Sequence, residues 1–162
     1  MNETHQYCTF YLDDRYFGID VLKVQEIVRP QSITRVPLTS PIVRGLINLR
    51  GQIVTAIDVR RRLNLTPLDS HGERPGGDQA TSRATPHAPL NVVVRTDDGA
   101  VSLLVDEIGD VLTLPSQSLA PPPQTLPTDF RDVILGAYQL PDQLLVILDV
   151  DCLTQIPSDV RT

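Results

Sequence analysis

The chain has 162 residues, of which 41% are hydrophobic, with fourteen prolines, no tryptophan and a formal net charge of −6 at pH 7. A chain of this length forms one domain, or two small subdomains that share a core. Its apolar runs, such as Leu144–Leu148, are far shorter than the ~20 residues that cross a bilayer. Residues 1–6 have neither the basic start nor the apolar run of a signal peptide. We therefore expect a soluble, cytoplasmic protein with no direct membrane insertion, and the sparse Cys8 and Cys152 fit a reducing compartment.

Short apolar stretches separated by turn residues dominate the pattern, which is typical of β-strands. The first pair flanks Asp13-Asp14, the second flanks Arg50-Gly51-Gln52, and the third flanks a turn in which Asp98-Gly99 supplies a positive φ. Three hairpins are therefore predicted: residues 9–12 with 16–19, 46–49 with 53–57, and 91–95 with 101–105.

The predicted helices are brief, and each begins at a side chain that can cap it. Asp20 precedes residues 21–24, and Ser40-Pro41 has the form of an N-cap followed by a first-turn proline. Asp58 and Asp149 precede two further short helices. A parallel α/β sheet would need longer crossover helices than these. The pattern therefore predicts an all-β fold, mainly antiparallel, with a few short helices.

The chain contains an internal duplication. Residues 45–59 return without gaps as residues 136–150, with five of fifteen positions identical, and residues 19–28 resemble residues 103–112. The two pairs of similar segments occur in the same order along the chain. This order predicts two copies of one β-rich unit, each too small to form a stable hydrophobic core alone. We place the first unit at about 8–63 and the second at about 90–154.

Residues 64–89 separate the two units and contain four prolines and three glycines but no Val, Ile or aromatic residue. Such a segment cannot bury enough apolar surface to order itself, so we predict a flexible linker, and we assign residues 155–162 to a C-terminal tail.

The two halves of the chain differ in charge. Residues 15–62 carry nine basic and three acidic residues, a net charge of +6, whereas residues 90–162 carry three basic and eleven acidic residues, a net charge of −8. One interpretation is two ordinary solvated surfaces. The other is head-to-tail attraction between molecules.

Catalytic chemistry finds no support in the sequence. His5 lies in the predicted N-terminal tail and His71 and His87 lie in the predicted linker, so none is held beside a nucleophile. No catalytic, phosphate-binding or metal-binding motif is present. The recurring Asp58 and Asp149 are explained as helix caps. We expect no catalytic residue, no metal and no cofactor.

Nucleic-acid binding is also disfavoured, although Arg60-Arg61-Arg62 could contact phosphates. The chain has only seven Phe and Tyr residues, is acidic overall and shows no aromatic stacking platform. Helical spacing distributes the three arginines around much of the circumference, which is typical of a solvated helix.

Several motifs together resemble the CheW family of coupling proteins from bacterial chemotaxis arrays. They are Y-F-G-I-D-V-L-K-V-Q-E-I at residues 16–27, R-G-L-I-N-L-R-G at 44–51, I-V-T-A-I-D-V-R at 53–60 and L-V-D-E-I-G-D-V-L at 104–112. The N-L-R-G hairpin followed by D-x-R is the most specific of these, and the resemblance extends over residues 8–154. No kinase or receiver signature accompanies it.

The resemblance implies two small five-stranded β-barrel subdomains packed around a shared hydrophobic core. It also implies a non-enzymatic adaptor without cofactors that couples the helical cytoplasmic tips of chemoreceptors to the regulatory domain of a CheA-type histidine kinase. Self-association in array rings would follow from the same role.

Residues can be carried over from the family one by one. The resemblance implies that the receptor-facing groove uses Val24, Ile27, Gly45, Ile108 and Val111. It further implies an ion pair between Glu26 and Arg50, and a kinase-facing position at Gly136.

Each of these residues also has a structural interpretation. The four Val and Ile side chains can belong to the core, because strand alternation turns only some of them outward. The two glycines can serve close backbone approach, and the ion pair can be purely architectural.

Overall fold

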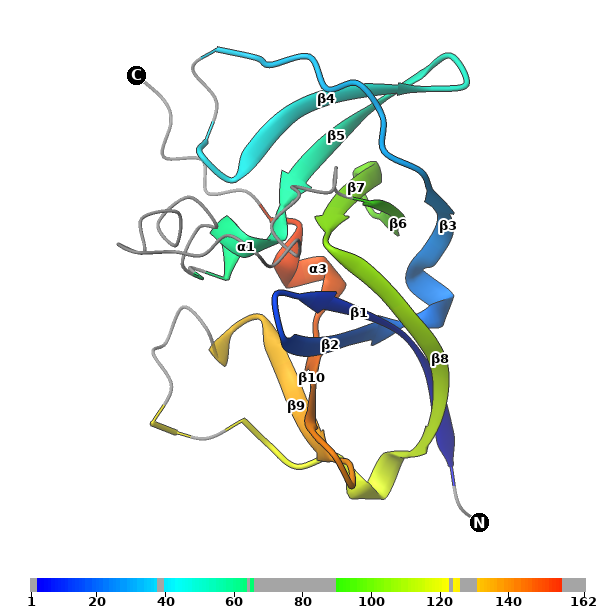
Figure 1. Cartoon of the computed structure of the whole chain (residues 1–162), viewed down its shortest axis with the longest axis vertical. Helices are drawn as coiled ribbons and strands as arrows, with labels where there is room; N and C mark the ends of the chain where they lie inside the picture. The colour runs from blue at the N-terminus through cyan, green and yellow to red at the C-terminus, as the bar shows by residue number, and fades with distance from the viewer. Residues whose placement is uncertain are drawn as a thin grey trace, which may run out of the picture.

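Two five-stranded sheets form the fold in the computed structural model, which describes residues 3–37, 40–63, 65, 90–122, 124–125 and 131–155. Sheet A and sheet B lie at opposite ends of the molecule, and the helix α3 (Val150–Leu153) lies between them (Figure 1). Sheet A consists of β1 (Thr4–Leu12), β2 (Arg15–Asp20), β8 (Glu107–Pro115), β9 (Ile134–Gln139) and β10 (Leu144–Leu148). Sheet B consists of β3 (Val24–Val28), β4 (Val43–Leu49), β5 (Gln52–Asp58), β6 (Leu90–Thr96) and β7 (Gly99–Val105). The other described helices are η1 (Val21–Lys23), α1 (Val59–Arg62) and η4 (Ser116–Ser118). The predicted all-β class with a few short helices is confirmed.

The duplication is visible in the topology, because the strand orders β8-β1-β2-β10-β9 and β3-β6-β7-β5-β4 are equivalent. In each sheet one central pair is parallel, β2 with β10 and β5 with β7, and the other pairs are antiparallel. Strands β1–β5 therefore correspond to β6–β10. Each sheet nevertheless combines two strands from one copy with three from the other, so the two copies are interleaved rather than separate.

Single bridges, rather than continuous ladders, connect the open sides of the two sheets. In sheet B, Thr34 and Leu46 exchange two backbone hydrogen bonds of 2.8 Å, and in sheet A, Ala120 and Ala137 exchange two of 2.9 Å. The strand pairings do not include β3 with β4 or β8 with β9. Closure of each sheet into a complete barrel therefore stays a prediction.

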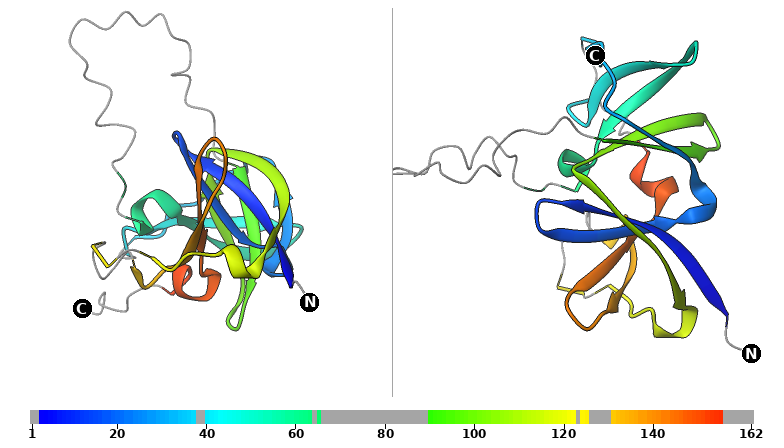
Figure 2. Two further views of the ribbon diagram at one scale, coloured as in Figure 1. Left: turned by 90° about the horizontal axis from the view of Figure 1, so that it is seen from below. Right: turned by 45° about the vertical axis from the view of Figure 1, so that its right-hand side comes forward.

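Three hydrophobic clusters hold the fold together. The largest lies between the sheets and includes Phe10 and Phe17 from sheet A with Val92 and Leu103 from sheet B. This is the predicted shared core, to which α1 and α3 also contribute. The right-hand view in Figure 2 shows α3 between the two sheets. A second, aliphatic cluster lies on the other face of sheet B, and a third lies on the other face of sheet A. Each fully buried aliphatic side chain contributes about 1.5–3 kcal/mol.

Local capping explains where the short helices begin. The Asp58 side chain accepts a hydrogen bond from Arg61 N at 3.3 Å, and Asp149 accepts one from Asp151 N at 3.0 Å. Asp20 accepts one from Leu22 N at 2.9 Å. These three predicted caps are confirmed, and a cap of this kind is typically worth ~1 kcal/mol.

Two local predictions are wrong. Ser40 accepts a hydrogen bond from Ile42 N at 3.3 Å, but it caps only one turn before β4 begins, so no helix follows Pro41. His5 lies in β1, opposite Leu114, rather than in a tail. Most of the predicted linker, residues 64 and 66–89, and residues 156–162 of the predicted tail lie outside the described residues.

Candidate functional site

The edge strand β3 presents apolar side chains at the border of the shared core. Val24 pairs with Val94 and Ile27 pairs with Val92, and directly paired residues project from the same face of a sheet. Val92 and Val94 belong to the core between the sheets. Val24 is half-buried against that core, whereas Ile27 is 45% exposed. Strand β3 therefore extends the core outward to the molecular surface.

The equivalent edge strand β8 does the same from sheet A. Ile108 pairs with Phe10 and Val111 pairs with Cys8, and both partners belong to the shared core. Ile108 packs against that core, and Val111 is 54% exposed. We call the residues Val24, Ile27, Ile108 and Val111 the core margin. Their arrangement follows the duplication, because Val24 corresponds to Ile108 and Ile27 to Val111.

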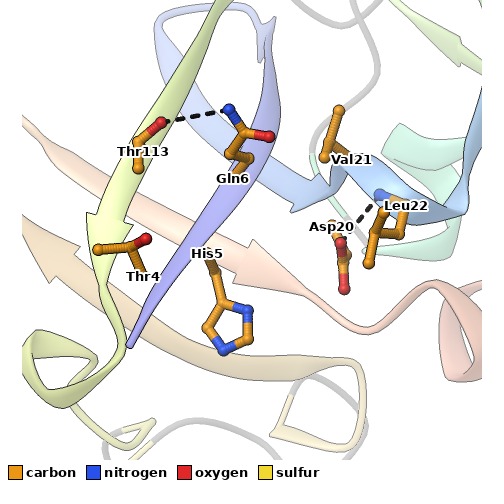
Figure 3. A pocket seen from close by; sticks show the side chains of 7 residues that line it. All are labelled: Thr4, His5, Gln6, Asp20, Val21, Leu22 and Thr113. Atoms are coloured by element: carbon orange, nitrogen blue, oxygen red, sulfur yellow. Dashed lines mark hydrogen bonds between the residues drawn. The ribbon is translucent and has the colours of Figure 1, made fainter. Parts of the chain in front are cut away.

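A hollow of about 300 Å³ lies along β1, between η1 and β8, and Figure 3 shows the side chains that line it. Thr113, two residues after Val111 on β8, lies on the same face of the strand and accepts a hydrogen bond from Gln6 Nε2 at 3.4 Å. The hollow is lined by Thr4, His5, Gln6, Asp20, Val21, Leu22 and Thr113.

Leu22 is the most exposed large apolar residue in the described part of the chain, at 81%. Sequence reasoning placed it in a capped turn but did not single it out. The repeat alignment could have identified Leu22, because the equivalent position in the second copy carries the charged Asp106. A large apolar residue at a position that tolerates a charge is a candidate for a contact with a partner.

Glu26 and Arg50 are brought together by the fold. Arg50 Nη2 and Nη1 donate to Glu26 Oε1 and Oε2 at 2.8 and 3.3 Å, so the pair is bidentate. Glu26 pairs with Val93 and projects from the face of sheet B that is opposite the core margin. Arg50 lies in the β4–β5 turn with φ 55° and is 76% exposed. The pair therefore links β3 to the β4–β5 hairpin across the open side of sheet B.

Gly45 and Gly136 lie at the two bridges described above. A Cβ at Gly45 would overlap with the carbonyl oxygen of Thr34, and a Cβ at Gly136 would overlap with that of Ala120. Both positions therefore require glycine for close backbone approach. Gly45 lies apart from the core margin, because it is on β4, whereas the margin is formed by β3 and β8.

The hairpin ends carry two further apolar residues that sequence reasoning missed. Ile53 at the start of β5 and Leu144 at the start of β10 are exposed and occupy equivalent positions of the duplication. They pair with Asn48 and Gln139, which are also equivalent. The repeat alignment itself was the signal, because both copies keep an aliphatic residue at the same outward position.

The prediction of a solvated helix at residues 60–62 is wrong for Arg60 and Arg62, whereas Arg61 is exposed as expected. The side chain of Arg60 is largely buried beside Asp13 and Asp106, and the hydrogen bond to Asp13 raises the pKa of its guanidinium. Arg62 donates to backbone carbonyl oxygens at the end of α3 at 2.9 and 3.1 Å. These side chains are therefore engaged in internal contacts.

Burial favours the neutral forms of two thiols and one tyrosine hydroxyl. Burial raises the pKa of the Cys8 thiol and, together with Asp149, that of the Cys152 thiol. Burial raises the pKa of Tyr7, whose hydroxyl lies 3.2 Å from that of Tyr138. Within the described ranges, no group of His, Cys, Asp and Glu side chains is arranged to hold a metal ion, and no helix has the length and apolarity to span a membrane. The apolar surfaces suit protein recognition.

Comparison with known proteins gives one family. The CheW-like domain matches residues 6–157. The chemotaxis protein CheW of Treponema pallidum (strain Nichols) is 27% identical over 151 residues, covering 92% of this chain and 81% of that protein. The chemotaxis protein CheW of Bacillus subtilis (strain 168) is 28% identical over 142 residues, covering 88% and 81%. The crystal structure of the scaffolding protein TtCheW from Thermoanaerobacter tengcongensis has the same fold, with a TM-score of 0.76 at 23% identity over 98% of each chain.

Proposed function

The chain belongs to the CheW-like domain family, and from this premise we propose that it is the adaptor that couples chemoreceptor tips to a CheA-type histidine kinase. The family consists of non-enzymatic scaffolds, and the curated relatives are chemotaxis proteins. The chain is therefore a signalling adaptor that interacts with components of a chemotaxis assembly. Its proposed place is cytoplasmic, at the membrane-bound receptor arrays.

The observation that carries the receptor part of the proposal is the core margin. Two equivalent edge strands each expose one aliphatic residue, Ile27 or Val111, beside a half-buried one, Val24 or Ile108. An amphipathic helix binds such a surface by placing apolar side chains against it at helical spacing. A receptor tip, which is helical, fits this chemistry.

The hairpin ends are the proposed contacts for the regulatory domain of the kinase. Ile53 and Leu144 are carried by different sheets, so one molecule offers two end surfaces that are related by the duplication. Such a molecule can join like domains end to end, and a closed arrangement of such contacts is a ring. Gly136, on the strand that pairs with β10, supports the surface near Leu144 in this proposal. Self-association in rings would use the same ends.

Two matched substitutions separate the two proposed surfaces. Ile27→Asp should abolish retention of a receptor-tip fragment but keep the kinase regulatory domain, because a charge would be buried in an apolar contact. Ile53→Asp should do the opposite. Both residues are exposed, so neither change should impair folding, and circular dichroism provides the control. Loss of both partners in each variant, or of neither, would contradict the assignment.

A further inference from the structure

The chain passes from one sheet to the other at two places in the described strands. After β2 it leaves sheet A through the three residues of η1 and enters β3 in sheet B. After β7 it leaves sheet B through the single residue Asp106 and enters β8 in sheet A. The two crossings are equivalent in the duplication, because Leu22 of η1 corresponds to Asp106. Each crossing leads directly into an edge strand that bears half of the core margin.

The crossing at Asp106 is held by a partly buried ionic network. Arg60 Nη1 and Nη2 donate to the two carboxylate oxygens of Asp13 at 2.7 and 2.8 Å, and Nη2 also donates to Asp106 Oδ2. Asp13 N donates to Asp106 Oδ2 at 2.7 Å, and Asp106 N donates to Tyr11 O at 3.1 Å. The Arg60 side chain is 10% exposed. Bidentate contacts between a guanidinium and a carboxylate are strong and directional.

This network joins elements of both sheets. Arg60 belongs to α1, which directly follows β5 of sheet B, and Asp13 belongs to the turn between β1 and β2 of sheet A. Asp106 is the crossing residue itself. One guanidinium therefore fixes the end of sheet B, the β1–β2 turn of sheet A and the chain that connects the two sheets.

The other crossing, at η1, is stabilised by fewer and weaker contacts. Its ion pair joins Lys23 Nζ to the two carboxylate oxygens of Asp151 at 3.2 and 3.5 Å, with both side chains about half exposed. No residue of η1 is buried, and Leu22 projects into solvent. Exposed pairs of this kind contribute at most ~1 kcal/mol. The molecule therefore has one firmly held crossing and one compliant crossing.

We propose that Arg60, Asp13 and Asp106 form a clamp that sets the spacing between the two halves of the core margin, so that Arg60 is a positioning residue for the helical partner. The proposal rests on the proposed function. Ile27 and Val111 lie four and five residues after their crossings, so the angle at the crossings determines how far apart they are held. Motion between the sheets then takes place at η1, whereas the Asp106 crossing keeps its geometry.

The spacing can be measured without any partner. Spin labels at the exposed positions Gln25 on β3 and Asp110 on β8, introduced as Q25C and D110C with Cys152→Ser, report the distance between the two edge strands by pulsed electron resonance. Cys8 can remain, because it is buried. Arg60→Lys keeps the charge but loses the planar fork, and Asp13→Asn keeps a residue that tolerates the positive φ of 61°.

Arg61→Gln is the matched control, because it removes a charge from the same short helix outside the clamp. We expect one narrow distance distribution for the parent chain and Arg61→Gln, and a broadened one for Arg60→Lys and Asp13→Asn. Unchanged distributions in both clamp variants would overturn the proposal.

Binding of a soluble helical-hairpin fragment of a chemoreceptor tip completes the test. At a temperature where all variants are folded, the two clamp variants should bind about fivefold more weakly or worse, the lower end of typical coupling between sites, while Arg61→Gln binds as the parent does. A broadened distribution with parental affinity would refute the positioning role. If the parent chain itself does not bind the fragment, the proposed function is wrong. The distance distributions still test whether the clamp sets the spacing between the two edge strands.

Discussion

Replacing Gly45 by alanine tests how the open side of sheet B is held. The added Cβ would overlap with the backbone oxygen of Thr34, which cannot move away without breaking its two hydrogen bonds with Leu46. Each such bond contributes about 0.5–1.5 kcal/mol net, and a positive φ costs an L-residue about 1–2 kcal/mol. We therefore expect Gly45→Ala to lower the free energy of unfolding by about 2–5 kcal/mol.

The control is Gly99→Ala, at a turn where φ is also positive but no atom lies within 4 Å of the new Cβ. For this variant the free energy of unfolding should fall only by the cost of a positive φ, about 1–2 kcal/mol. Urea unfolding monitored by far-ultraviolet circular dichroism and by tyrosine fluorescence measures both losses. The four tyrosines all lie in sheet A, so coincident transitions would show that sheet B unfolds together with it. Equal losses in the two variants would refute the contact argument.

Three other changes test separate parts of the account. Arg50→Ala breaks an exposed pair with Glu26, so we expect a stability loss of ~1 kcal/mol or less and weaker pull-down of receptor or kinase; unchanged pull-down would make the pair purely architectural. Burial raises the pKa of Tyr7, so the unfolded chain releases that proton first, and the contribution of Tyr7 to stability should be fully present below about pH 10 and be lost above it. Urea titrations across this range should show a smaller fall in Tyr7→Phe, and an identical fall would contradict the assignment. Deleting residues 69–87 should barely change the melting temperature, because loop-closure entropy varies slowly with length; a drop of many degrees would show that this segment packs.

The duplication allowed much of the fold to be predicted. It identified equivalent strands and equivalent caps, because hydrophobic alternation and capping are local properties that a sequence displays directly. It did not reveal that each sheet takes strands from both copies. Pairing between β2 and β10, or between β5 and β7, joins distant segments, and periodicity contains no information about which strands become neighbours.

The candidate site was predicted in part. Val24 and Ile108 pack on the core, whereas Ile27 and Val111 are exposed. The core interpretation therefore holds for one residue of each strand, and the other residue is available for contact with a partner. The burial of Arg60 could not be predicted, because a helix of four residues has no apolar face from which its orientation can be judged. Its partners Asp13 and Asp106 are distant in sequence and come together only through the crossing of the chain.

The central claim is that the core margin binds a helical partner. The most direct test is a titration of the ¹⁵N-labelled protein with an unlabelled receptor-tip fragment. The amide resonances of the labelled protein are followed during the titration. The account predicts chemical-shift changes along β3 and β8, around Ile27 and Val111, with the hairpin ends at Ile53 and Leu144 unaffected. Changes confined to the hairpin ends, or spread evenly over both sheets, would contradict it.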